Sequence, residues 1–187
     1  MTLGEGKEKV YKLLDEHSSG GEVAHDADIE MKMADFFDIA QKKCAQVERL
    51  TGVMTLRRKP GRTEFPMPDG FDGLVAVWRD GETTNRYRWK NGKLVVPESD
   101  TAEIQVEYFK TPATINGNMQ DSEEFEVSEF AAQLLPFYVC AQNLFPDLMI
   151  DYRPYLLEWE KGLQELERRQ AERGGGVRFV NTFYRRS

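Results

Sequence analysis

The chain has 187 residues, of which 40% are hydrophobic and 30% charged, and this is the composition of a globular domain that can bury a core. No run approaches the roughly 18–20 apolar residues that a membrane-spanning helix needs, and the N-terminal MTLGEGKEKV lacks the apolar stretch of a secretory signal. The formal net charge of −7 disfavours a general nucleic-acid-binding surface, because affinity for a duplex depends on neutralising phosphates.

Two helices are expected in the first 50 residues. Residues 3–17 carry a narrow apolar stripe and end at SSGG, residues 18–21. The second helix is expected from Asp26 or Asp28 to about Leu50, because either aspartate suits an N-cap and Gly52 lies just beyond the end. Its apolar residues recur at steps of three and four: Ile29, Met33, Phe36, Phe37, Ala40, Cys44 and Val47.

From residue 53 to residue 109 the period changes to two, which indicates short strands separated by turns. Asn91-Gly92 is the favoured dipeptide of a two-residue hairpin turn. In the strand before it, Tyr87 and Trp89 are expected on one face, with Arg86 and Arg88 on the other. The segment predicts a small antiparallel sheet or barrel.

Two more helices are expected after a loop that runs to residue 127. Ser128 can cap the first of them, and Pro136 is expected to kink it or to split off its first turn. The last helix is expected from about Asp151 to Glu172, with Glu165 and Arg169 forming a surface pair.

The last fifteen residues are unlike the rest of the chain. Three glycines, residues 174–176, precede VRFVNTFYRRS, and the whole segment holds four arginines and no carboxylate. The remaining residues, 1–172, include 21 basic and 32 acidic residues, so their formal charge is −11, whereas that of the last fifteen residues is +4. Fifteen residues cannot bury their own apolar side chains, so we expect an arm that becomes ordered on a partner. The expected contact residues are Arg173, Val177, Arg178, Phe179, Val180, Phe183, Tyr184, Arg185 and Arg186.

Motifs that would indicate catalysis or metal binding are not found in the sequence. His17 and His25 have no nearby Ser or Cys to activate, and Asp26, Asp28 and Glu30 lack the later ligands of a calcium loop. The two cysteines, Cys44 and Cys140, are expected to be buried reduced thiols in a cytosolic protein. We therefore expect a structural or interaction protein and not an enzyme, with no cofactor and no metal.

Together these patterns predict an α+β fold: a four-helix bundle with a small antiparallel β module inserted between the helix pairs, followed by an extended C-terminal arm. The bundle is expected to comprise residues 1–52 and 111–172, the β module residues 53–110, and the docking arm residues 173–187.

This order of parts resembles the head-to-tail adaptor (head completion or connector) proteins of tailed bacteriophages. Three stretches carry the resemblance: FPMPDGFDGLVAVWRDGETTNRYRW (65–89) is similar to their β module, IQVEYFKTPATI (104–115) to its last strand, and DSEEFEVSEFAAQLLPFYVCAQNLF (121–145) to their third helix. The first 25 residues have no clear counterpart in the family.

The resemblance implies a homo-oligomeric ring, commonly dodecameric, in the neck of the virion between capsid and tail, made in the host cytoplasm. Such a ring docks on the portal protein through its C-terminal segment and extends the DNA channel. It helps to retain the packaged genome, lets double-stranded DNA pass without specific binding, and offers a platform for the next tail or neck component. No membrane partner is implied.

A second hypothesis is a nucleic-acid-binding module. Tyr87 and Trp89 would stack on bases, while Arg86, Arg88 and the basic arm would contact phosphates. The simpler alternative is that the two aromatic side chains fill the core between the sheet and the helices.

Overall fold

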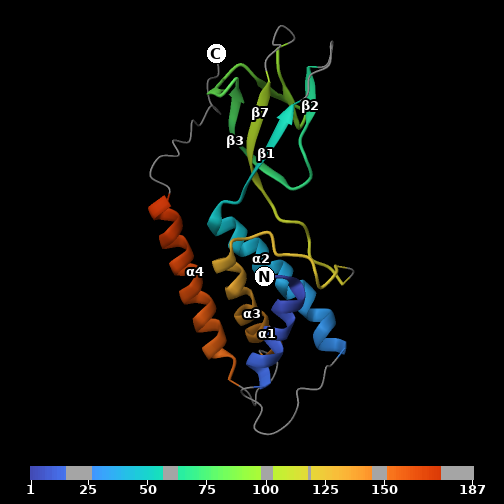
Figure 1. The fold of residues 1–187 in the computed structure, drawn as a ribbon, viewed down its shortest axis with the longest axis vertical. Helices are drawn as coiled ribbons and strands as arrows, with labels where there is room; N and C mark the ends of the chain where they lie inside the picture. The colour runs from blue at the N-terminus through green and yellow to red at the C-terminus, as the bar shows by residue number, and fades with distance from the viewer. Residues whose placement is uncertain (16–26, 57–62, 98–102, 118, 145–150, 174–187) are drawn as a thin grey trace. The chain divides into compact units, whose positions relative to one another are not determined.

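The computed structural model describes residues 1–15, 27–56, 63–97, 103–117, 119–144 and 151–173. This part of the chain divides into a helical unit, Met1–Glu48 with Pro112–Arg173, and a β unit, Arg49–Thr111. The elements, coloured along the chain in Figure 1, are α1 (Leu3–Asp15), α2 (Ala27–Glu48), β1 (Thr51–Leu56), β2 (Glu64–Pro66), β3 (Phe71–Arg79), β4 (Glu82–Thr83), β5 (Arg88–Lys90), β6 (Lys93–Val95), β7 (Ile104–Lys110), α3 (Glu129–Leu144) and α4 (Arg153–Arg173).

The starts of the last two helices are set by local side chains, and the cap of α3 is the predicted one. The Ser128 hydroxyl accepts a hydrogen bond from the Ala131 N–H at 3.2 Å, which caps α3. Asp151 Oδ1 accepts one from the Arg153 N–H at 3.1 Å, at the start of α4. Pro136 lies inside α3, which runs unbroken from Glu129 to Leu144, so it does not split off a first turn, and the alternative of a kink stays a prediction.

Helix α3 is the centre of the helical unit. It packs against α1, α2 and α4, whereas α1 packs mainly on α3 (Figure 1). The reason is its composition, since a helix that is apolar on several faces must be covered from several sides. Its buried residues are Ala131, Ala132, Leu134, Leu135, Pro136, Val139, Cys140 and Ala141.

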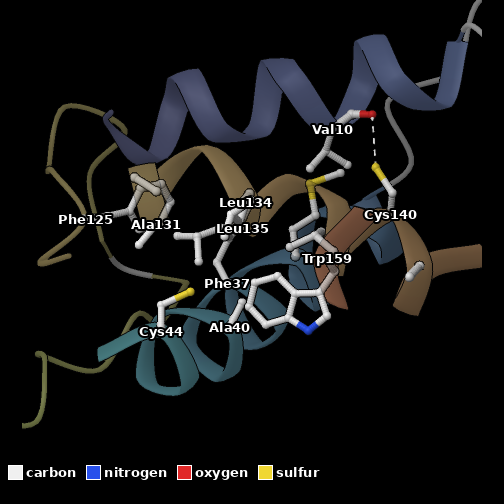
Figure 2. Packing of buried hydrophobic residues seen from close by; sticks show 14 of the residues in the cluster. Val10, Phe37, Ala40, Cys44, Phe125, Ala131, Leu134, Leu135, Cys140 and Trp159 are labelled. Atoms are coloured by element: carbon white, nitrogen blue, oxygen red, sulfur yellow. Dashed lines mark hydrogen bonds between the residues drawn. The ribbon is translucent and has the colours of Figure 1, made fainter. Parts of the chain in front are cut away.

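The core of the helical unit collects side chains from all four of its described helices. Val10, Phe37, Leu135 and Trp159 are each at most 5% exposed, and Figure 2 shows them converging on α3. Phe37 also contacts the ring of Phe125, with centroids 5.3 Å apart.

The segment that returns from the β unit, residues 112–128, is held along one side of α2 by polar side chains. Asp38 Oδ1 accepts a hydrogen bond from the Ile115 N–H at 2.9 Å. Glu48 Oε2 accepts one from the Ser128 N–H at 3.0 Å. Between them, the buried side chain of Gln41 donates to the Ala113 carbonyl at 3.2 Å and accepts from the Glu126 N–H at 2.8 Å.

The strands of the β unit form two antiparallel sheets, with the orders β1-β7-β3-β4 and β2-β6-β5. Burial alternates along β1, β2 and most of β7, and the two sheets contribute to one core of Leu56, Phe65, Val77, Leu94, Val96, Ile104 and Val106. Asn91 and Gly92, with φ of 50° and 72°, make the predicted two-residue turn between β5 and β6.

The predicted architecture is therefore wrong in its arrangement, although the protein is α+β. The helices are not the expected four-helix bundle, because α3 takes a central position instead of one corner among four. The strands do not form one small inserted module either, since they divide between two separate sheets. Of the expected arm, residues 173–187, the structure describes Arg173 as the last residue of α4, and residues 174–187 lie outside the described residues.

Candidate functional site

The outer face of the three-stranded sheet gathers basic side chains. Within it Lys90 pairs with Lys93, and Arg88 pairs with Val95. Because side chains alternate along a strand, Arg88, Lys90 and Lys93 point to the same side, with Glu64 of β2. We call this surface, defined by Arg88, Lys90, Lys93 and Glu64, the cationic face.

The charges of the cationic face are open to solvent. The side chains of Lys90 and Lys93 are 67% and 49% exposed, and that of Glu64 is 45% exposed. Glu64 lies 3.8 Å from Lys90 Nζ and 3.6 Å from Lys93 Nζ. One carboxylate is therefore shared by two ammonium groups, which leaves the face with an excess of positive charge. Arg86, just before β5, is also exposed.

The aromatic residues of this region lie elsewhere. Trp89 pairs with Leu94 on the opposite side of the sheet, and its ring stacks on Phe71, with centroids 5.3 Å apart and an angle of 19°. Tyr87 precedes β5 and packs against the core of the β unit. The strand that carries Trp89 is therefore shorter than predicted, because β5 begins only at Arg88 and Tyr87 precedes it.

A second exposed surface lies on the four-stranded sheet. Val53 of β1 is 66% exposed and stands opposite Glu107 of β7, which in turn stands opposite Ala76 of β3. These residues alternate with Met54 and other side chains that face the core. Two residues along, Thr55 and Gln105 stand opposite each other on the same face, so this surface mixes apolar and polar side chains around the carboxylate of Glu107.

Charge is distributed unevenly between the two units. The residues Met1–Glu48 and Pro112–Arg173 include 11 basic and 23 acidic side chains, a formal charge of −12. Residues Arg49–Thr111 include 11 basic and 9 acidic side chains, a charge of +2. The acidity of the protein therefore belongs to the helical unit, and the average over the whole chain conceals it.

The arm residues expected to bind a partner, from Val177 to Arg186, lie outside the described residues, and Arg173 is the last residue of α4. The same is true of His17, His25 and Asp26. Within the described ranges there is no group of three or more His, Cys, Asp or Glu side chains placed to hold a metal ion, and no helix there is long and apolar enough to cross a membrane.

Both cysteines are buried free thiols, as predicted. Burial raises the pKa of Cys44 to about 12, and the nearby carboxylate of Glu48 acts in the same direction. Burial also raises the pKa of Cys140 to about 12, and its thiol lies 3.8 Å from the Val10 carbonyl (Figure 2). Neither sulfur is in the thiolate form that nucleophilic chemistry requires near neutral pH.

The chain matches no protein-family model and no curated protein sequence.

Sequence reasoning missed two features of these surfaces. It did not find the cationic face, because Lys90 and Lys93 flank the turn and meet only once the hairpin closes. A signal was present, since residues 83–97 hold four basic residues and no acidic one. It also gave Val53 no role, and nothing in its local pattern distinguishes that valine from a buried one.

Proposed function

We propose that the protein is a head-to-tail adaptor of a tailed bacteriophage, a ring subunit that docks on the portal protein and extends the DNA channel. In this role it acts mechanically, in the neck of the virion. It helps to retain packaged DNA and provides the platform for the next tail or neck component.

The terminal segment carries this proposal. Residues 173–187 combine four arginines with five apolar or aromatic residues, and they follow residues 1–172, which carry a formal charge of −11. A segment of this composition is suited to docking on a partner by strand addition or in a groove.

The exposed apolar side chains support an assembled state. Ile39 of α2 and Leu157 of α4 are each 50% exposed on the helical unit, and Val53 is 66% exposed on the β unit. A ring repeats one head-to-tail interface around a closed axis, so each copy presents two different surfaces to its neighbours. Apolar side chains on both units are compatible with such an interface.

The alternative of a base-stacking nucleic-acid module has less support. One side of the Trp89 ring is occupied by Phe71, and Tyr87 packs against the core. Single-strand binders of this kind need aromatic faces that are open to bases. We therefore do not propose it as a second function.

Mass photometry of the purified protein, alone and mixed with the portal protein of the same phage, tests the proposal. We expect a ring of fixed high stoichiometry in at least one of these conditions, bound to the portal in the mixture. A protein that stays monomeric and unbound in both conditions would contradict the adaptor function.

A further inference from the structure

We propose that the cationic face of the three-stranded sheet binds the phosphate backbone of double-stranded DNA. This inference deepens the proposed function, because it names the surface by which a ring subunit touches the DNA in its channel. It differs from the base-stacking hypothesis, since it uses the basic side of the hairpin and not its aromatic side.

The geometry suits contacts with a backbone. Arg88 and Lys90 are two residues apart on one strand, which separates them by about 7 Å, and Lys93 stands beside Lys90 on the neighbouring strand. This spacing exceeds the 3.4 Å axial rise per phosphate of one DNA strand, so the side chains can reach separate phosphates. The Asn91-Gly92 turn is tight and adds no bulky side chain beside them.

The distribution of charge favours phosphate binding at this face over phosphate binding elsewhere on the protein. The β unit is at +2 although the whole chain is at −7, and residues 83–97, which contain the hairpin, hold four basic residues and no acidic one. An acidic helical unit repels DNA at the same time, which confines contact to the β unit. Attraction at one surface and repulsion at another let DNA be held without adhering along the whole subunit.

Glu64 limits the strength of the contact between this face and DNA. Its ion pairs with Lys90 and Lys93 are long and solvent-exposed, and such pairs contribute little stability. Phosphates can therefore replace the carboxylate as the partner of the two lysines with little loss of folding stability. The same carboxylate competes with DNA, so it keeps binding weak, as a surface past which DNA must move requires.

Fluorescence anisotropy of a labelled duplex of about 20 base pairs, titrated with the full-length protein over a range of salt concentrations, tests the inference. Three phosphate contacts give a slope of log K against log salt of about −2.7, or an approximately 40-fold loss of affinity from 50 to 200 mM salt. We expect the triple variant Arg88→Gln, Lys90→Gln, Lys93→Gln to reduce the slope of the wild-type protein by about that amount. The arginines of residues 173–187 are unchanged in this variant, so any contribution from them cancels.

A matched control removes the same number of charges from the helical unit, with Lys12→Gln, Lys32→Gln and Lys43→Gln. We expect this control to leave the slope unchanged. Glu64→Gln should change duplex affinity in the opposite direction: removing the competing carboxylate is expected to raise the affinity several-fold. If the cationic face did not contact DNA, this substitution would not raise the affinity.

Three results would overturn the inference: no duplex binding at 20 mM salt, equal loss in the triple variant and in its control, or a preference for single strands that Trp89→Ala abolishes. A change in oligomeric state with unaltered duplex binding would also overturn it, since the face would then meet the acidic helical unit of a second copy. Ring formation and portal binding are measured separately, so a ring that docks normally but does not touch DNA refutes this inference and leaves the adaptor function intact.

Discussion

Gln41 is the residue on which the connection between α2 and the returning segment depends most. It is 1% exposed, and its amide satisfies two backbone groups of residues that are far away in the sequence, the Ala113 carbonyl and the Glu126 N–H. A buried backbone group without a partner costs more than its hydrogen bond contributes, because its desolvation is no longer offset. Gln41 therefore holds the segment in position and also contributes to the stability of the protein.

Gln41→Met keeps the volume of the side chain and removes both hydrogen bonds. We expect it to lower the free energy of unfolding by about 2–4 kcal/mol, since two backbone groups lose their partners. Urea denaturation followed by circular dichroism measures this change. Gln46→Met, at an exposed position of the same helix, is the control and should stay within about 0.5 kcal/mol of wild type. Equal effects of the two substitutions would show that the hydrogen bonds do not matter.

The two thiols provide a prediction about reactivity and pH. Because burial raises the pKa of Cys44 and of Cys140 to about 12, both should resist alkylation by iodoacetamide at pH 8 in the native protein and react in 8 M urea. The unfolded thiols lose their protons near pH 9, before the folded ones do. Stability that is fully present below that pH should therefore fall as pH rises towards 12. Rapid native labelling of either cysteine, detected by mass spectrometry, would contradict this placement.

At this scale the sequence located the core positions of α2 well, because steps of three and four place residues such as Met33, Phe37, Ala40 and Cys44 on one side of a helix. It did not distinguish Gln41, which is adjacent to Ala40 and polar. Whether a glutamine at the margin of an apolar stripe is buried depends on what covers it. Here the cover is residues 113–126, far away in the sequence.

Among the elements, the crossing of α3 and α4 is set by a glycine. Gly162 of α4 lies against Leu134 of α3, and a Cβ at this glycine would overlap Leu134 Cδ2 and lie 2.8 Å from Cδ1 and 3.1 Å from Cγ. Without that Cβ, the two helices approach closely enough to bury Trp159 and Leu166 nearby. The glycine is thus a packing residue inside a helix, where its low helix propensity is otherwise unfavourable.

Gly162→Ala should destabilise the protein by about 1–3 kcal/mol through overpacking, despite the higher helix propensity of alanine. The cost should largely disappear in a Leu134→Ala background, where the space is vacant, and a double-mutant cycle in urea measures this coupling. Gln164→Ala, at an exposed position of α4, is the control and should change stability by less than about 0.5 kcal/mol. A stabilising effect of Gly162→Ala would refute the close approach.

Elements were predicted more accurately than their arrangement. Ser128 as the cap of α3, the Asn91-Gly92 turn and the Glu165–Arg169 pair, with 2.8 Å between their charged atoms, are all confirmed. These features depend on residues at most four positions apart. The strand expected through Tyr87 begins one residue later, at Arg88, because its start depends on pairing with β6, which begins at Lys93 and ends at Val95.

At the scale of the whole molecule, the separation of charge and the terminal segment determine which partners are suitable. The helical unit is strongly acidic, the β unit slightly basic, and the segment after Arg173 basic. Arginine-rich, aromatic segments bind best where carboxylates and an apolar groove occur together. In the adaptor hypothesis the partner for this segment is the portal protein.

Deletion of residues 174–187 should leave the far-ultraviolet circular dichroism nearly unchanged, because the buried core residues that the structure describes lie within residues 3–166. Binding to the portal protein should fail in the same variant. Phe179→Ala and Phe183→Ala should each weaken docking by about 1–3 kcal/mol if the rings are buried anchors, measured by biolayer interferometry, with Asn181→Ala as the control in the same segment. Unfolding on deletion would instead make the segment part of the core.

By itself the sequence determined the order of helical and β segments, the cap of α3, the hairpin turn and the cationic character of the terminal segment. Each follows from neighbours within a few positions along the chain. Only the tertiary structure decided that α3 is central, that the strands divide into two sheets, and that Arg88, Lys90 and Lys93 share a face. Those outcomes depend on which apolar surfaces meet and which strands pair, as when β1 pairs with β7 across the whole β unit. Local propensity carries no information about contacts over such distances.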